Sequence, residues 1–305
     1  MPRLGMGTWK AAGGEVGAAV QHALNLGYRH LDCASVYGNE AEIGAALQVV
    51  LSGGGVQRQQ LWITSKLWND CHSPEEVRPA LERSLKALGL EELDLYLIHW
   101  PVAQRRGVLM PQRAEELIPL EQLPLSDTWE AMEELVEAGL VRYIGVSNFT
   151  QQHLNQLLPD CRLRPVVNQV ERHPWLRQQQ LLEFCGREAI HITAYSPLGS
   201  AASGQTSPLL QDPEVMAIAA ERGCTEAQVL LAWAIACGTS VIPKSVQPSR
   251  LAANLAAAQL QLSDSEVQRL DALDREHRFV DGSFWDLPGG PYCKEVLWGS
   301  ATSRS

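Results

Sequence analysis

Eight short, strand-like apolar runs recur along the 305 residues, and helix-like segments separate them. Most of these runs are bounded by glycine or polar residues and have no polar face, as expected of parallel strands buried on both sides. This alternation predicts an α/β protein with a closed (β/α)8 TIM barrel and long βα loops; a doubly wound open sheet is the alternative. The expected strands cover residues 3–9, 28–34, 61–66, 93–100, 141–148, 165–171, 191–197 and 240–245.

Signals for helix starts and ends support this alternation. Residues 73–76, Ser-Pro-Glu-Glu, provide an N-cap serine, a proline at the first helical position and a glutamate three residues after the cap. Two more capping boxes begin at Thr225 and Ser263. Glycines stand where helices are expected to end, at Gly27, Gly89, Gly139 and Gly223.

Three stretches fall outside the alternation, at residues 52–60, 103–127 and about 279–305. Long loops of this kind are usually lids or binding loops, or are simply mobile. The chain shows no repeat beyond the β/α alternation and no linker between domains. We therefore expect one barrel domain over residues 1–305.

The overall charge argues against some partners. The net charge is −10 and the pI about 5.3, whereas a nucleic-acid surface needs a basic stripe. A phosphate-bearing cofactor needs only a few local cations and is compatible with this charge. Seven scattered cysteines without a CxxC pair fit a reducing cytosol better than a disulfide framework.

Several motifs that would indicate another class of protein are missing. No apolar run approaches the roughly 18 residues of a membrane span, and the first residues lack a signal-peptide pattern. We therefore expect a cytoplasmic protein that binds no membrane. The sequence contains no HExxH, paired Cys/His zinc spacing, GxxxxGK[ST] or GxSxG, so we expect no metal site, P-loop or nucleophile elbow.

One dinucleotide-binding signal is incomplete. Gly5 and Gly7 form a GxG pair, and Asp32 follows at about the distance of a Rossmann ribose-binding acid. Lys10 stands where the third small residue of that fingerprint belongs. This mismatch disfavours a Rossmann dehydrogenase.

Four polar residues stand at or just after three successive expected strands. Asp32 ends the second strand, Tyr37 lies in the next loop, Lys66 ends the third strand and His99 lies at the end of the fourth. Each has an ordinary structural explanation when taken alone, such as a cap, a packed ring or a solvated charge. In a barrel, however, the carboxyl ends of the strands meet at the face that carries the active site. The joint occurrence therefore favours a catalytic site.

These four groups are chemically consistent with a general acid beside a carbonyl. A free tyrosine has a pKa near 10, which makes it a weak acid at neutral pH. A nearby lysine ammonium stabilises the phenolate and lowers that pKa, and a carboxylate keeps the lysine in place and charged. A histidine can donate a hydrogen bond to a carbonyl oxygen and orient it.

Several long segments, in the same order along the chain, resemble the aldo-keto reductase superfamily and, within it, the aldehyde reductase and aldose reductase group. The resemblance extends from about Leu4 to about Arg278 and agrees with the number of expected strands. The matching segments are GYRHLDCASVYGNE, SKLWN, LDLYLIHWP, YIGVSNF, NQVE, AYSPLG and IPKS.

The resemblance implies a catalytic tetrad of Asp32, Tyr37, Lys66 and His99, with Tyr37 as the proton donor. It implies reduction of aldehydes and some ketones by NADPH, which would bind extended at the barrel mouth without a Rossmann fold. Tyr195 resembles the residue that stacks on the nicotinamide ring. The other implied contacts to this half of the cofactor are Gly7, Thr8, Trp9, Ser147, Asn148, Gln169, Ser196 and Leu198.

Residues 242–254 resemble the site for the adenosine 2′-phosphate. Lys244 and Arg250 supply positive charge there, which an additional phosphate requires, so NADPH is favoured over NADH. A solvated helix start is the alternative interpretation. Ala253 replaces an acidic or amide residue of many relatives, which predicts a weaker contact with adenine. The remaining implied contacts are Ser245, Val246 and Asn254.

Trp9, Trp68 and Trp100 resemble the aromatic walls of the family's substrate pocket. An apolar, aromatic pocket with few polar groups suits aldehydes. The C-terminal stretch, about residues 279–305, corresponds to the loop over the active-site mouth that sets substrate preference in relatives. The chain begins almost at its first strand, so we expect no N-terminal hairpin of the kind that plugs the barrel bottom in relatives.

The expected partner is a small-molecule carbonyl compound, with no nucleic acid and no membrane, and the expected state is a monomer. A different class of function remains as the alternative. The superfamily includes lens crystallins and ion-channel subunits, so the same residues would also fit a cofactor-binding scaffold or regulatory subunit. The complete tetrad favours the enzyme.

Overall fold

Eight parallel strands form the central sheet of the computed structural model, which describes residues 1–11, 13–200 and 205–299. Each strand pairs with the next one of the sheet along the chain. The strands are β1 (Met6–Gly7), β2 (His30–Asp32), β3 (Trp62–Leu67), β4 (Leu93–Ile98), β7 (Val141–Ser147), β8 (Val167–Glu171), β9 (His191–Tyr195) and β10 (Ser240–Val241).

The first and last strands meet and close the sheet into a barrel. Parallel bridges join Leu4 to Val241 and Gly7 to Lys244, and the Gly5 amide donates to the Val241 carbonyl at 2.8 Å. A Cβ atom on Gly7 would lie 2.6 Å from the Ile242 carbonyl oxygen, so the closure requires glycine there. The prediction of a (β/α)8 barrel is confirmed, and the open-sheet and Rossmann alternatives are wrong.

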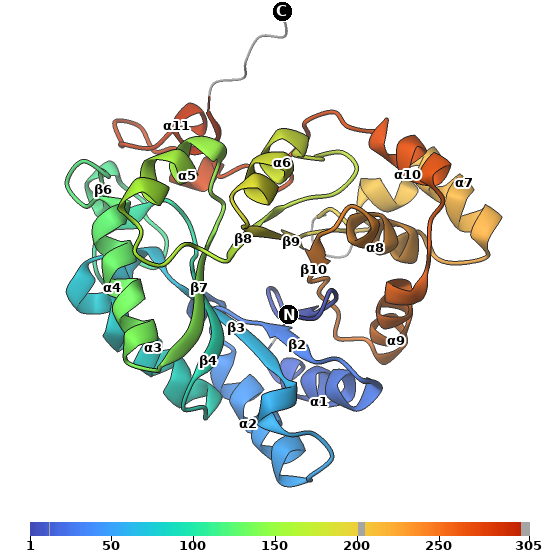
Figure 1. The fold of residues 1–305 in the computed structure, drawn as a ribbon, viewed down its shortest axis with the longest axis horizontal. Helices are drawn as coiled ribbons and strands as arrows, with labels where there is room; N and C mark the ends of the chain where they lie inside the picture. The colour runs from blue at the N-terminus through green and yellow to red at the C-terminus, as the bar shows by residue number, and fades with distance from the viewer. Residues whose placement is uncertain (12, 201–204, 300–305) are drawn as a thin grey trace, which may run out of the picture.

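Helices surround this ring of strands, as Figure 1 shows, and their apolar faces form the core with the sheet. No helix in the described ranges is long and apolar enough to cross a membrane. The helices are α1 (Val16–Leu26), α2 (Glu40–Ser52), α3 (Pro74–Leu88), α4 (Leu125–Glu137), α5 (Gln151–Leu157), α6 (Gln179–Arg187), α7 (Pro213–Arg222), α8 (Glu226–Ala236), α9 (Pro248–Ala256), α10 (Asp264–Asp271) and α11 (Lys294–Trp298).

Most of the expected helix caps are present. The Thr225 and Ser263 side chains accept hydrogen bonds from the third backbone amide of α8 and α10. The four expected glycines follow their helices in the left-handed conformation. At α3 the prediction is wrong in one respect, because the Ser73 side chain makes no capping hydrogen bond. Glu76 instead pairs with Arg106 at 2.8 Å, which ties α3 to the long insertion.

Two segments expected to be irregular contain short elements. The insertion at residues 103–127 carries a two-stranded antiparallel sheet of β5 (Ala103–Gln104) and β6 (Leu117–Ile118) before α4 begins. The C-terminal stretch carries a 3-10 turn at Ser283–Trp285 and the helix α11. The Tyr292 hydroxyl connects the two segments, since it accepts from the Ala103 amide at 2.9 Å and donates to the Ile118 carbonyl at 2.6 Å.

Candidate active site

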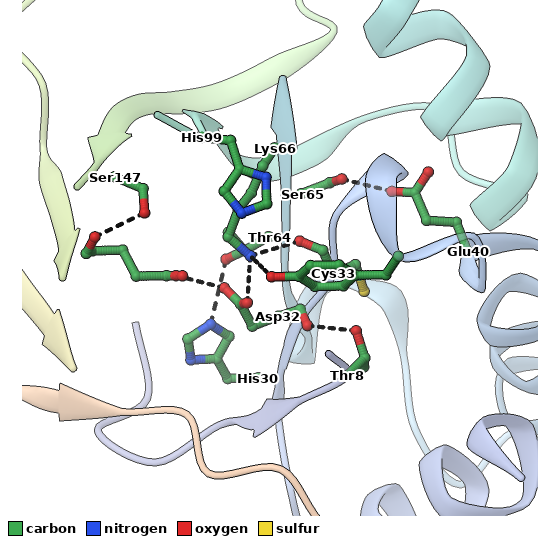
Figure 2. A network of polar contacts seen from close by, with 12 residues as sticks. Thr8, His30, Asp32, Cys33, Glu40, Thr64, Ser65, Lys66, His99 and Ser147 are labelled. Atoms are coloured by element: carbon green, nitrogen blue, oxygen red, sulfur yellow. Dashed lines mark hydrogen bonds and ion pairs between the residues drawn. The ribbon is translucent and has the colours of Figure 1, made fainter. Parts of the chain in front are cut away.

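The Lys66 ammonium is the centre of a buried polar cluster at the carboxyl ends of β2 and β3 (Figure 2). Its Nζ atom lies 2.5 Å from Oδ1 of Asp32, and both side chains are almost completely buried. It also donates to the Cys33 carbonyl at 2.8 Å and lies 3.5 Å from the Tyr37 hydroxyl. The structure therefore brings three of the four expected catalytic residues together around one cation.

Local folding places Tyr37 beside this cation. The chain leaves β2 and forms a 3-10 turn over Ser35–Tyr37, which Gly38 ends in the left-handed conformation. The turn carries the phenol over the end of β3, where Nζ of Lys66 lies 5.2 Å from the ring centre. The five-residue separation of Asp32 and Tyr37 in the sequence thus reflects a strand end followed by one tight turn.

His99 follows β4 and completes the expected group of four. Its ring meets the Tyr37 ring edge-on with centroids 5.8 Å apart, and the Trp68 ring at 5.0 Å. Burial, helped by the charge of Lys66, holds the pKa of His99 well below its usual value, so the imidazole is neutral. Figure 2 shows this ring and the His30 ring on opposite sides of the Lys66–Asp32 pair.

Burial dominates the protonation of the phenol. It raises the pKa of Tyr37 to about 12, although Lys66 acts in the opposite direction. The expected lowering by lysine is therefore present but is outweighed by the loss of hydration. Burial lowers the pKa of Lys66, yet Asp32 and Tyr37 together raise it above its ordinary value. At neutral pH the cluster thus holds a charged lysine beside a protonated phenol.

Two residues expected to contact the cofactor also hold Asp32, one through its carboxylate and one through its backbone carbonyl. Gln169 in β8 donates its amide to Oδ2 of Asp32 at 2.6 Å, and the Thr8 hydroxyl donates to the Asp32 carbonyl at 2.8 Å. The Lys66 ammonium donates a hydrogen bond to the other carboxylate oxygen, Oδ1. Residues from three parts of the chain therefore hold Asp32 in place.

The side chains expected to hold the nicotinamide form one connected network. The Tyr195 hydroxyl donates to Oδ1 of Asn148 at 2.7 Å, and the Asn148 amide donates to the His99 carbonyl at 2.9 Å. The Ser147 hydroxyl donates to the Gln169 carbonyl at 2.8 Å. Asn148 and Ser196 both adopt positive φ, 64° and 44°, directly after their strands. Unfavourable backbone conformations of this kind concentrate at functional sites.

The expected phosphate site lies where β10 leads into α9. Lys244 and Arg250 are exposed, and neither has an acidic partner within 4.0 Å in the described ranges. The Ser245 hydroxyl oxygen accepts a hydrogen bond from the Gln247 backbone amide at 3.2 Å, just before the helix starts. Asn254 is buried in α9. Two exposed cations close to a helix N-terminus fit a phosphate.

Two of the three expected pocket tryptophans share one aromatic cluster with the C-terminal stretch. Trp68 and Trp100 are almost buried and pack with Trp285 at centroid separations of 5.8 and 5.9 Å. Trp298 adds a further edge contact with Trp100 at 5.8 Å. Trp9 lies outside this cluster, is 38% exposed and has the Lys10 ammonium over its ring.

Two other residues expected to contact the cofactor pack against the main core, and some contributors to the site were missed. Leu198 and Val246 are half-buried against the main core. No three His, Cys, Asp or Glu side chains in residues 1–11, 13–200 and 205–299 gather to hold a metal ion. Trp285 and Trp298 were missed because the tail has no periodic pattern. Glu171 was also missed, although its place two residues after Gln169 on one strand was a usable signal.

Comparison with known families and proteins adds an independent finding. The family model described as the aldo/keto reductase family matches residues 3–275. An aldo/keto reductase of Synechocystis sp. is 53% identical over 98% of this chain and 93% of its own length. The aldo-keto reductase family 1 member A1 of Mus musculus is 46% identical over 92% of this chain and 88% of its own.

Solved structures show the same likeness. An aldose reductase from Giardia lamblia superimposes with a TM-score of 0.89 at 43% identity, over 94% of this chain and 97% of that one. The aldose reductase of Schistosoma japonicum gives a TM-score of 0.86 at 42% identity, over 92% of this chain and 91% of that one.

Proposed function

Because the chain belongs to the aldo/keto reductase family, we propose that it is an NADPH-dependent aldehyde reductase. Similarity to a family 1 member A1 protein and to two aldose reductases supports carbonyl reduction. The proposed substrates are aldehydes, because the aromatic cluster beside His99 is apolar with few polar groups. Some ketones are expected to fit as well.

The observation that carries the proposal is the Lys66 ammonium shared by Asp32 and Tyr37. NADPH, when bound, would supply hydride to the carbonyl carbon. Tyr37 donates the proton from its hydroxyl to the carbonyl oxygen, and a phenolate remains. Lys66 stabilises that phenolate, while Asp32 keeps the ammonium in place. The net change adds one hydride and one proton across the C=O bond.

His99 has a separate role in this proposal. Its neutral imidazole can donate a hydrogen bond to the substrate oxygen without competing as an acid. Its edge contacts with Tyr37 and Trp68 place it between the acid and the aromatic wall. A carbonyl oxygen bound there would have the proton donor on one side and an apolar surface on the other.

The chain's own residues also support the choice of cofactor. Lys244 and Arg250 would hold the 2′-phosphate, with Ser245 and Val246 beside it and Asn254 toward the adenine. Tyr195 would stack on the nicotinamide ring, and Ser147, Asn148 and Gln169 would hold its carboxamide. Gly7, Thr8, Trp9, Ser196 and Leu198 would line the space between these ends.

The proposal further describes a monomeric cytoplasmic enzyme of one barrel domain that acts without nucleic acid, membrane or metal. The net charge of −10 supports the absence of nucleic acid. A cofactor-binding scaffold or regulatory subunit is the competing function, and it predicts binding of NADPH without turnover. The intact cluster around Lys66 favours the enzyme.

The test is loss of NADPH absorbance with benzaldehyde, with NADH in parallel and Tyr37→Phe as the matched control. General acid catalysis contributes about 10²–10⁴-fold, so we expect Tyr37→Phe to lose at least about 100-fold in kcat. NADPH should be preferred over NADH through a lower KM. Full activity of Tyr37→Phe would refute the assigned acid, and equal use of NADH would refute the phosphate site. NADPH binding without turnover would support the scaffold.

A further inference from the structure

Glu171 is a buried carboxylate that the proposed chemistry does not use. It ends β8, its side chain is fully buried, and both of its oxygens are occupied. Oε1 accepts the Phe279 amide at 2.7 Å and lies 2.9 Å from Nε2 of His173. Oε2 accepts the Val280 amide at 2.8 Å. The side chain thus binds two consecutive backbone amides at the start of the C-terminal segment, residues 279–299.

The place of Glu171 on its strand relates it to the chemistry. Side chains two residues apart on a strand point to the same face, about 7 Å apart along it. Val167, Gln169 and Glu171 form such a series in β8. Val167 packs inside the barrel with Leu95, and Gln169 reaches Asp32. Glu171 therefore lies two residues beyond Gln169 toward the carboxyl end of β8, which is at the barrel mouth.

The segment that Glu171 holds supplies part of the aromatic cluster. Trp285 packs against Trp68 and Trp100, and Trp298 packs against Trp100. Trp68 in turn meets the His99 ring. A shift at Phe279 and Val280 would pass along the chain to Trp285, and from there it would reach the surface beside His99 through the rings of Trp285 and Trp68.

A second connection holds the far part of the same segment. The Tyr292 hydroxyl binds the backbone of β5 and β6. Within the segment, Lys294 pairs with Asp281 at 2.6 Å, and the Trp298 indole donates to the Asp281 carbonyl at 2.7 Å. The segment is thus an internally bonded unit. Glu171 ties its beginning to the strand that carries Gln169.

We propose that Glu171 is a positioning residue that sets substrate selectivity by fixing the C-terminal segment over the mouth. Hydrogen bonds from amides to a buried carboxylate are among the stronger ones in proteins, and losing an acceptor leaves buried donors unpaired. The selectivity favours bulky aromatic aldehydes, which would contact the aromatic cluster of Trp68, Trp100 and Trp285 that the segment holds in place. Small aliphatic aldehydes would not depend on that cluster. This inference rests on the proposed function.

The experiment compares Glu171→Gln with the unchanged protein in two measurements. Hydrogen exchange reports directly on the Phe279 and Val280 amides, and we expect protection in 279–299 to fall at least about tenfold while β4 stays protected. Steady-state kinetics gives the ratio of kcat/KM for 2-naphthaldehyde to that for propanal. We expect this ratio to fall about tenfold through the KM for naphthaldehyde, with kcat nearly unchanged.

Glu133→Gln is the matched control. Glu133 in α4 is also a buried carboxylate that accepts a backbone amide, from Leu163 at 2.7 Å, and it pairs with Arg162. Leu163 lies in the connection that enters β8 from the opposite end of the barrel, so this variant should lose stability and keep the ratio. If Glu171→Gln does not fold, Glu171→Asp replaces it, since the shorter carboxylate cannot reach both amides.

The outcomes separate the two proposals. Lower protection together with a lower ratio supports the positioning role. Lower protection with an unchanged ratio, or equal losses for both aldehydes, overturns it, because the contact is then only structural. Unchanged protection overturns it as well. If the unchanged protein reduces no aldehyde, selectivity falls with the proposed function, while the exchange data still show whether Glu171 holds the segment.

Discussion

Replacing Lys66 with methionine tests the central electrostatic argument. Methionine keeps much of the length and bulk of lysine but removes its charge from between Asp32 and Tyr37. The phenolate formed when Tyr37 donates its proton would lose a cation now 3.5 Å from its oxygen. We therefore expect the pKa of Tyr37 to rise further and the proton transfer to slow.

The magnitude follows from Coulomb's law. Unit charges 3.5 Å apart interact by about 5 kcal/mol at an effective dielectric constant of about 20. Proton transfer is only about half complete in its transition state, so roughly 2–3 kcal/mol of this interaction is lost from the stabilisation of that state. Since about 1.4 kcal/mol corresponds to a factor of ten, kcat should fall roughly 30- to 150-fold.

The assay must separate catalysis from folding. Lys66→Met alone leaves the buried Asp32 charge unpaired, which typically costs about 3–5 kcal/mol of stability. The double variant Asp32→Asn, Lys66→Met removes both charges and should recover much of the free energy of unfolding in urea. Its kcat should stay low, because the phenolate still lacks its cation. Recovery of kcat in the double variant, or a loss below about threefold in the single one, would refute the reasoning.

Two further predictions concern stability. A Cβ on Gly44 would clash with the backbone of Ala87 and Leu88, so Gly44→Ala should lower the free energy of unfolding by about 1–3 kcal/mol in thermal unfolding. A Cβ on Gly186 in α6 would meet only open space, so Gly186→Ala should raise that free energy by roughly 0.5–1 kcal/mol. Equal effects of the two variants would contradict the packing argument. The Arg222 hydrogen bonds lower the pKa of Glu266 to about 2 from 4.5, so its stabilisation is complete above about pH 4.5 and is lost as the pH falls through 2. Urea unfolding at pH 2 to 6 should show that loss, and Glu266→Gln should flatten it.

Particular elements show how far local patterns predicted this fold. The run around Tyr96 was largely apolar on both faces, which only a sheet covered on both sides accommodates. The capping boxes at Thr225 and Ser263 act within one helical turn, so short sequence spacing was enough to find them. Ser73 fitted the same pattern, but Glu76 found a stronger partner in Arg106, thirty positions along the chain.

In the active site, too, some features could be predicted from the sequence and others depend on the fold. Asp32, Tyr37, Lys66 and His99 could be found because each stands at or just after a strand end, and parallel strand ends share one face. The net pKa of Tyr37 could not be found this way, because it depends on how much water the folded neighbours exclude. The tail gave no periodic signal, since its aromatic rings pack against partners almost two hundred residues away.

The sequence by itself determined the alternation of strands and helices, and with it which residues reach the barrel mouth. Those features depend on spacing within a turn or a strand, which the chain specifies locally. The tertiary structure alone decided that Gln169 holds Asp32, that burial keeps the Tyr37 phenol protonated and that Glu171 binds the C-terminal segment. These outcomes depend on distances and hydration between distant segments, which exist only after the barrel has closed.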